Sequence, residues 1–198
     1  MFGDSWIKKF QSWRDEGHVS RYPIIPDDVT PWPNRGVQFV DANAFLAWGE
    51  PEGAVVQKLL DSGMMKNLCT EGTVYSDIRT LFMGHRVQII LNYFPEFEDP
   101  HVENTLAVCH LVDWPKGSHE DYLSVQKSLA DQIGQPTDQG PTLGYPNLPR
   151  SLWDFEYSRV LLAVELDRSD NLELRLRFRR KGLPKWEEWS EKHGAKHF

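Results

Sequence analysis

The stretch WDFEYSRVLLAVELDRSDNLELRLRFRR, residues 153–180, decides the fold. Within its last nine residues, apolar and charged side chains alternate one by one: Leu172, Leu174, Leu176 and Phe178 against Glu173, Arg175, Arg177 and Arg179. Successive side chains of a strand point to opposite faces, so this alternation predicts a strand with one buried face and one solvent face. A turn at residues 168–170 predicts a hairpin with the strand before it, residues 153–167.

Three further strands are predicted upstream. Residues 73–94, TVYSDIRTLFMGHRVQIILNYF, show a period of two and predict a hairpin with a tight turn at Gly84-His85. One face of its second strand carries Val87, Ile89, Leu91 and Tyr93. Residues 105–114, TLAVCHLVDW, are apolar on both faces, which is typical of a central strand covered on both sides.

Helical spacing appears in five segments. These are residues 5–16, 42–48 (ANAFLAW, with Asp41 as its cap), 51–63 (PEGAVVQKLLDSG), 118–133 and 183–194. The fourth carries an apolar stripe of Tyr122, Val125, Leu129 and Ile133. Two stretches rich in proline and glycine, residues 19–36 and 135–151, predict an extended linker and a long loop.

These elements predict an α+β fold. We expect a mostly antiparallel sheet of about five strands in the order βββ-α-ββ, helices on one face, and an N-terminal helical extension. We expect residues 1–36, a helix plus a proline-rich linker, to dock on a single α+β domain of residues 37–198. The order α-βββ-α-ββ-α over roughly residues 51–193 is similar to that of bacterial type III secretion chaperones. This resemblance of element order implies a fold and not a function.

Composition places the chain among globular proteins, with 40% hydrophobic and 26% charged residues. The two cysteines, Cys69 and Cys109, form no CxxC pair, which favours reduced thiols in the cytoplasm. No stretch approaches the ~20 apolar residues of a membrane span, and no signal-peptide pattern precedes the body. The common nucleotide and hydrolase motifs are absent, so we predict no cofactor.

Charge is spread unevenly along the chain. Residues 171–198 hold eight lysines and arginines against four glutamates, a net charge of +4. Since the whole chain has a net charge of −7, the other 170 residues carry a net charge of −11. The arginines at 175–181 suggest weak binding of nucleic acid as one alternative. We favour ordinary cross-strand pairing, in which Arg175 and Arg177 meet Glu165 and its neighbours on an exposed sheet face.

Aromatic residues suggest a second candidate surface. Trp153, Phe155 and Tyr157 share one face if residues 153–167 form a single strand, while Val160 and Leu162 lie on the other. The apolar register therefore switches near residues 157–159, which predicts either a bulge or a change in the layer that covers the strand. With Tyr145 in the preceding loop, these rings predict an aromatic groove for a peptide or ligand. The chain holds eight tryptophans in all, and most are expected in the core.

One acidic loop is a candidate metal site. Glu96, Glu98, Asp99, His101 and Glu103 lie within eight residues, and carboxylates with an imidazole are ligands for a divalent cation. Together with Asp113 or His110, the loop suggests a metal-assisted hydrolase. The ordinary interpretation, which we favour, is a solvated acidic loop, with His110 and Cys109 as core residues.

The hypothesis that fits these observations best is a non-enzymatic, cytoplasmic protein that binds another protein or itself, in the manner of an adaptor or chaperone. The aromatic groove would supply buried anchors, and the basic strand would steer an acidic partner. The metal-dependent enzyme and the nucleic-acid binder remain alternatives.

Overall fold

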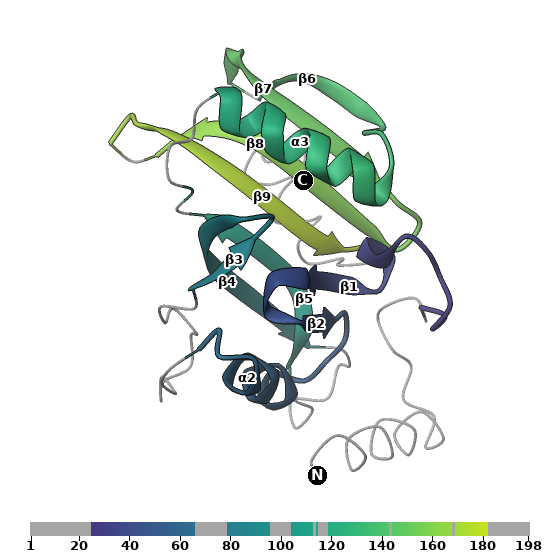
Figure 1. Ribbon diagram of the computed structural model, residues 1–198. Coiled ribbons are helices and arrows are strands. Elements are labelled where there is room, and N and C mark those ends of the chain that lie inside the picture. Colours follow the sequence, from purple (N-terminus) through teal and green to yellow (C-terminus); the bar gives the residue numbers. More distant parts are fainter. Residues whose placement is uncertain are drawn as a thin grey trace.

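Seven antiparallel strands form the main sheet, in the order β3-β4-β5-β9-β8-β7-β6 (Figure 1). This computed structural model of the chain describes residues 25–65, 79–95, 104–112, 114, 119–142, 144–167 and 169–181. The strands of the main sheet are β3 (Arg79–Phe82), β4 (His85–Pro95), β5 (Asn104–Val112), β6 (Asp138–Thr142), β7 (Tyr145–Asp154), β8 (Ser158–Leu166) and β9 (Leu172–Arg180). The remaining elements are η1 (Trp32–Asn34), β1 (Gly36–Phe39), η2 (Val40–Ala42), β2 (Ala44–Ala47), α2 (Glu52–Asp61) and α3 (His119–Ile133).

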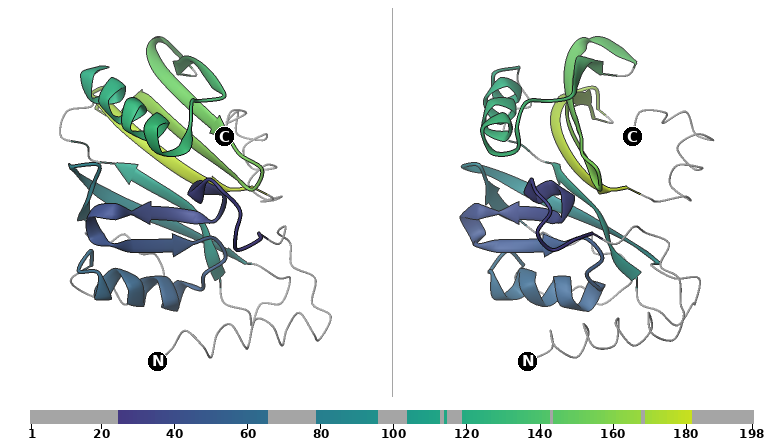
Figure 2. Two further views of the ribbon diagram at one scale, coloured as in Figure 1. Left: turned by 45° about the vertical axis from the view of Figure 1, so that its right-hand side comes forward. Right: turned by 90° about the vertical axis from the view of Figure 1, so that its right-hand side faces the viewer.

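The α+β class and the antiparallel sheet are confirmed, and the sheet is larger than predicted. Its two halves, β3–β4–β5 and β9–β8–β7–β6, meet where β5 pairs with β9. The helices α2 and α3 and the small β1–β2 sheet lie on the same side of it (Figure 2). The predicted position of β5 as a central strand is confirmed, since β4 and β9 flank it.

The predicted loop at residues 135–151 is wrong, because most of it is strand. Residues 138–142 form β6 and residues 145–154 form β7, so the order from α2 onward is α-βββ-α-ββββ. The prolines that suggested a loop sit where a strand tolerates them. Pro141 lies on the edge strand, and Pro149 precedes the part of β7 that pairs with β8. Neither position removes a hydrogen bond that a central ladder needs.

The short helix predicted at residues 42–48 is also wrong. Residues 44–47 form β2, which pairs with β1 from Gly36↔Ala47 to Phe39↔Ala44. Asn43 between them has a left-handed backbone, φ 49°, which turns the chain back on itself. Within β2 the buried residues alternate with half-buried ones, so the period is that of a strand.

The other helical predictions within the described residues are confirmed. Helix α2 follows Pro51 and ends before Gly63, whose φ is +71°. All four predicted residues of the stripe on α3 are buried: Tyr122, Val125, Leu129 and Ile133. The predicted helices at residues 5–16 and 183–194 lie outside the described residues, and so do residues 73–78 of the hairpin predicted at residues 73–94.

One turn and the predicted linker differ from their predictions in detail. Phe82 pairs with His85, so the β3–β4 turn is Met83-Gly84 and not Gly84-His85. Both turn residues have positive φ, as a two-residue hairpin turn of this kind requires. The second half of the predicted linker contains regular structure, because residues 32–34 form η1 and Gly36 begins β1.

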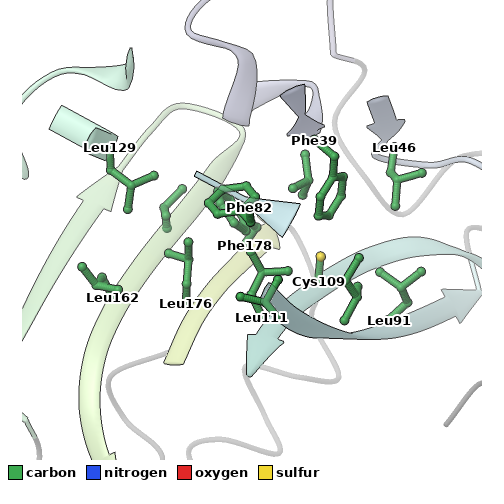
Figure 3. Packing of buried hydrophobic residues seen from close by; sticks show 14 of the residues in the cluster. Phe39, Leu46, Phe82, Leu91, Cys109, Leu111, Leu129, Leu162, Leu176 and Phe178 are labelled. Atoms are coloured by element: carbon green, nitrogen blue, oxygen red, sulfur yellow. The ribbon is translucent and has the colours of Figure 1, made fainter. Parts of the chain in front are cut away.

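The core lies between the main sheet and the layer formed by α2, α3 and the β1–β2 sheet (Figure 3). Phe82 and Phe178 stand at its centre, with ring centroids 6.1 Å apart. Phe39 reaches Phe82 from β1, and Trp32 reaches Phe178 from η1, at 5.9 and 5.5 Å. Aromatic pairs at these spacings add to the stabilisation from burial. These residues share the front face of the sheet, and they are buried there except for Trp32, which is partly buried.

Candidate functional site

The opposite face of the sheet carries the arginines of β9, and we call it the charged face. Among the described residues, this face carries Glu173, Arg175, Arg177 and Arg179 of β9, Arg159 and Glu165 of β8, Asp154 of β7 and His110 of β5. They lie opposite the front face because β9 alternates, with Leu174, Leu176 and Phe178 buried in the core.

Ion pairs inside the hairpin engage two of the arginines. Arg177 donates two hydrogen bonds to the carboxylate of Glu165, from Nη1 to Oε1 at 2.7 Å and from Nη2 to Oε2 at 2.6 Å. Arg175 donates from Nε and Nη2 to Oε2 of Glu173, at 2.9 and 2.7 Å, and its Nη1 lies 3.3 Å from Oε2 of Glu165. The two carboxylates balance the two guanidinium groups. The predicted cross-strand pairing of Arg175 and Arg177 with Glu165 is thus confirmed.

The expectation that the arginine face is solvent-exposed is wrong for part of its length. The side chain of Arg177 is 12% exposed, and Arg179 is 3% exposed. Neighbouring apolar residues on the same face, Leu161 and Ala163, are buried as well. A guanidinium group loses its hydration when buried and needs ion pairs or hydrogen bonds in exchange. Several charges of this strand are therefore buried parts of the fold, which the alternation alone did not indicate.

His110 lies beside the arginines, because it pairs with Arg177 across the β5–β9 ladder. Its Nε2 is buried and has no hydrogen-bond partner among the described residues. Burial, with the positive charges of Arg177 and Arg175, lowers the pKa of His110 to about 4. The imidazole is therefore neutral at pH 7. Sequence reasoning missed this neighbourhood, since only the non-local pairing of β5 with β9 reveals it.

The aromatic residues do not form one groove. Trp153 is completely buried, and its Nε1 donates to the carbonyl of Gly134 at the end of α3, at 2.7 Å. Tyr145 stands at the start of β7, nine strand positions before Asp154, and its side chain is exposed. A fully buried ring contacts no partner unless the fold rearranges, so we leave Trp153 out of any proposed binding surface.

The single strand predicted across Phe155 and Tyr157 is two strands with a turn. Strand β7 ends at Asp154 and β8 begins at Ser158, and the amide of Phe155 donates to the carbonyl of Ser158 at 2.9 Å. The predicted register switch therefore has a different cause, a chain reversal in place of a bulge. The amide of Tyr157 donates to Oδ1 of the buried Asn34, at 2.9 Å, which ties this turn to η1.

Beside this turn, Asp154 forms ion pairs with two basic side chains. Its Oδ1 lies 2.9 Å from Nε of Arg159 and 2.6 Å from Nζ of Lys181. Partial burial on its own raises the pKa of Asp154, but the hydrogen bonds from Lys181 and Arg159 outweigh it, and the pKa is lowered overall. This cluster is more exposed than the Arg177–Glu165 pair.

The predicted metal loop, Glu96, Glu98, Asp99, His101 and Glu103, lies outside the described residues, as does Asp113, so the metal site stays a prediction. Within the described ranges, no three histidine, cysteine or carboxylate side chains come together as a metal site would require. Cys109 is a free thiol in the core, where burial raises its pKa.

One end of the sheet presents apolar side chains that the sequence analysis did not single out. Among the described strands β3 is an edge strand, and Leu81 on it is 50% exposed. Val40, on η2 next to β3, is 68% exposed, and the amide of Gly84 donates to Asp41 beside it. Arg86, the cross-strand partner of Leu81, is exposed too. We call Val40, Leu81 and Arg86, with the outer backbone of β3, the β3 edge.

Comparison with known protein families, with curated proteins and with solved structures finds no match to this chain in any of the three. No described helix has the length and apolar character needed to cross a bilayer.

Proposed function

We propose that this chain is a cytoplasmic, non-enzymatic protein that binds another protein through the β3 edge. The observation that carries the proposal is the half-exposed Leu81 on an edge strand. An edge strand presents unpaired backbone donors and acceptors, and a partner segment adds to it by continuing the ladder. A large apolar side chain at such an edge supplies the buried contact that backbone pairing alone lacks.

The surroundings of Leu81 agree with this role. Proteins that must avoid edge-to-edge pairing place charges or proline on the edge strand. The described part of the other edge, β6, follows that rule, since it carries Asp138 and Pro141. Strand β3 carries one charge, Arg79 at its start, and no proline, and Leu81 stands in the middle of this edge strand, opposite Arg86 of β4. The contrast between the two edges favours β3 as the place of contact.

The charged face is a weaker candidate for the same role. Arg175 and Arg177 already form hydrogen bonds and ion pairs with Glu165 and Glu173, so an acidic partner would have to displace internal carboxylates. A cytoplasmic location is supported by Cys109, which packs as a free thiol in the core.

A capture experiment with matched variants tests the proposal. Leu81→Lys places a charge on the β3 edge, and Leu123→Lys places the same charge on α3, where Leu123 is 48% exposed. Partners captured from a native lysate are quantified for the tagged wild type and both variants, and light scattering reports self-association. We expect Leu81→Lys to lose at least about tenfold of the bound partner, because a lysine at a buried contact costs more than ~1.4 kcal/mol. Leu123→Lys should bind as the wild type does.

Two results would contradict the proposal. One is a wild-type protein that stays monomeric and captures no partner above the background. The other is equal capture by the wild type and by Leu81→Lys. Loss of self-association in Leu81→Lys would identify a second copy of the chain as the partner.

A further inference from the structure

The two halves of the sheet are joined by a short ladder. Strand β5 pairs with β9 through four residue pairs, from Val108↔Arg179 to Leu111↔Leu176, and we call this pairing the β5–β9 seam. By comparison, β8 and β9 pair through nine residues and β4 and β5 through eight. Fewer ladder hydrogen bonds hold the seam than hold either neighbouring ladder, so it is the easier place for the sheet to open.

His110 sits inside this seam, paired with Arg177. Among the described residues, the charged groups of β9 on its face are Glu173, Arg175, Arg177 and Arg179, and those of β8 are Arg159 and Glu165. From β4, the neighbours on the same face are Gln88, Ile90 and Asn92, none of which carries a charge. Within the described residues, then, the charges nearest to the imidazole are guanidinium groups.

The carboxylates are poorly placed to compensate a third positive charge. Both oxygens of Glu165 accept from Arg177, and Oε2 of Glu173 accepts two hydrogen bonds from Arg175. A protonated His110 would therefore meet two guanidinium groups in a buried place, with no acceptor for its Nε2 proton among the described residues. An opened seam would let water solvate the imidazolium and remove this penalty.

We propose that His110 makes the β5–β9 seam a pH-sensitive joint, in which protonation of the imidazole beside Arg175 and Arg177 opens the pairing of β5 with β9. The opening is local, because on the front face Phe178 of β9 stays packed against Phe82 of β3 and Trp32 of η1. The seam shares no residue with the β3 edge.

The sign of the effect follows from the ordinary pKa of histidine, 6.5, and the value of about 4 in the closed seam. A group whose pKa is lowered by folding stabilises the closed form fully above its ordinary pKa, and this stabilisation is lost as the pH falls below 6.5. Between pH 7 and pH 5 the equilibrium for opening should rise about 20-fold.

Hydrogen exchange on the full chain measures this directly. Amide protection at residues 108–111 and 176–179 is compared at pH 7 and pH 5, after correction for the intrinsic pH dependence of exchange. We expect the wild type to lose about 20-fold protection there, His110→Gln to show no such loss, and the control His85→Gln to behave as the wild type does. Loss of protection that persists in His110→Gln, or wild-type protection that does not change, would overturn the proposal.

A second measurement needs no variant. The imidazole proton of His110 is followed by NMR in the wild-type protein as the pH is lowered. Titration well below 6.5, accompanied by broadening of the seam amides, supports the joint. Titration at the ordinary value of 6.5 would show that Arg175 and Arg177 do not act on His110, and the proposal would be wrong.

Discussion

The two faces of the β8–β9 hairpin are both largely buried, yet they are stabilised in different ways. On the front face, Leu176 and Phe178 contact other apolar side chains, and burial of apolar area stabilises the fold. On the charged face, the side chain of Arg177 is nearly as inaccessible to solvent as those apolar side chains. Its burial is compensated by the ion pair with the carboxylate of Glu165. One strand therefore holds a contact that depends on area and a contact that depends on a specific partner.

This difference determines how each face responds to substitution. In an apolar core, the cost of a substitution rises with the volume of the cavity that it leaves, so a small change of shape costs little. A buried ion pair responds abruptly, because removal of one partner leaves the other without compensation for its lost hydration. Conservative changes should thus be mild on the front face and costly on the charged face, while truncation should be costly on both.

The largest effect is expected from Phe178→Ala on the front face. Phe178 is completely buried between Trp32 and Phe82, and the substitution opens a cavity at the junction of β9, β3 and η1. We expect the free energy of unfolding to fall by about 3–5 kcal/mol, as measured by chemical denaturation. Leu172→Ala, on an exposed residue of the same strand, is the control and should change it by less than about 0.5 kcal/mol. Similar losses for both variants would mean that Phe178 does not anchor the core.

An intermediate effect is expected from Glu165→Gln on the charged face. The change keeps the shape of the side chain but removes the charge that two guanidinium groups share. We expect a loss of about 2–3 kcal/mol at pH 7, below the full cost of breaking a buried pair because Glu165 is partly hydrated. A double-mutant cycle with Arg177→Leu measures the coupling between the two residues. A coupling near zero would show that Arg177 is stabilised by other contacts.

The front face of this hairpin was predictable from the sequence, whereas its neighbours were not. The alternation of leucine and arginine gives the register of β9 by itself, and the three-residue turn gives its partner β8. The pairing of β9 with β5 joins residues far apart in the chain, and no local pattern specifies it. The position of His110 beside Arg177 depends on that pairing, so it appeared only in the structure.

Ambiguous local signals explain the other errors. Proline and glycine at residues 135–151 are turn signals, but Pro141 and Pro149 occupy positions of β6 and β7 that lack a ladder partner on one side. Residues 153–167 fit one long strand by parity, although the register switch at Tyr157 already pointed to a break. A chain reversal at Phe155–Tyr157 accounts for that switch and for the burial of Trp153 away from Tyr145.

The smallest effect is expected from Asp154→Asn, which removes a more exposed charge from the neighbouring strand β7. Arg159 and Lys181 both reach Asp154, and their hydrogen bonds lower its pKa. The stabilisation is thus present above the ordinary carboxyl pKa of 3.8 and is lost as the pH falls below it. Because water screens these pairs, the substitution should cost less than about 1 kcal/mol and the difference should vanish at about 1 M salt.

A cost for Asp154→Asn that equals that of Glu165→Gln and persists in salt would contradict the distinction drawn between the two ion-pair clusters. Asp154 would then act as a buried charge does, through its partners and not through the solvent. The comparison is well matched, because both substitutions replace a carboxylate by its amide on the charged face of the β7–β8–β9 strands. The ratio of the two costs therefore measures how much burial, and not charge alone, makes the Arg177–Glu165 pair important for the fold.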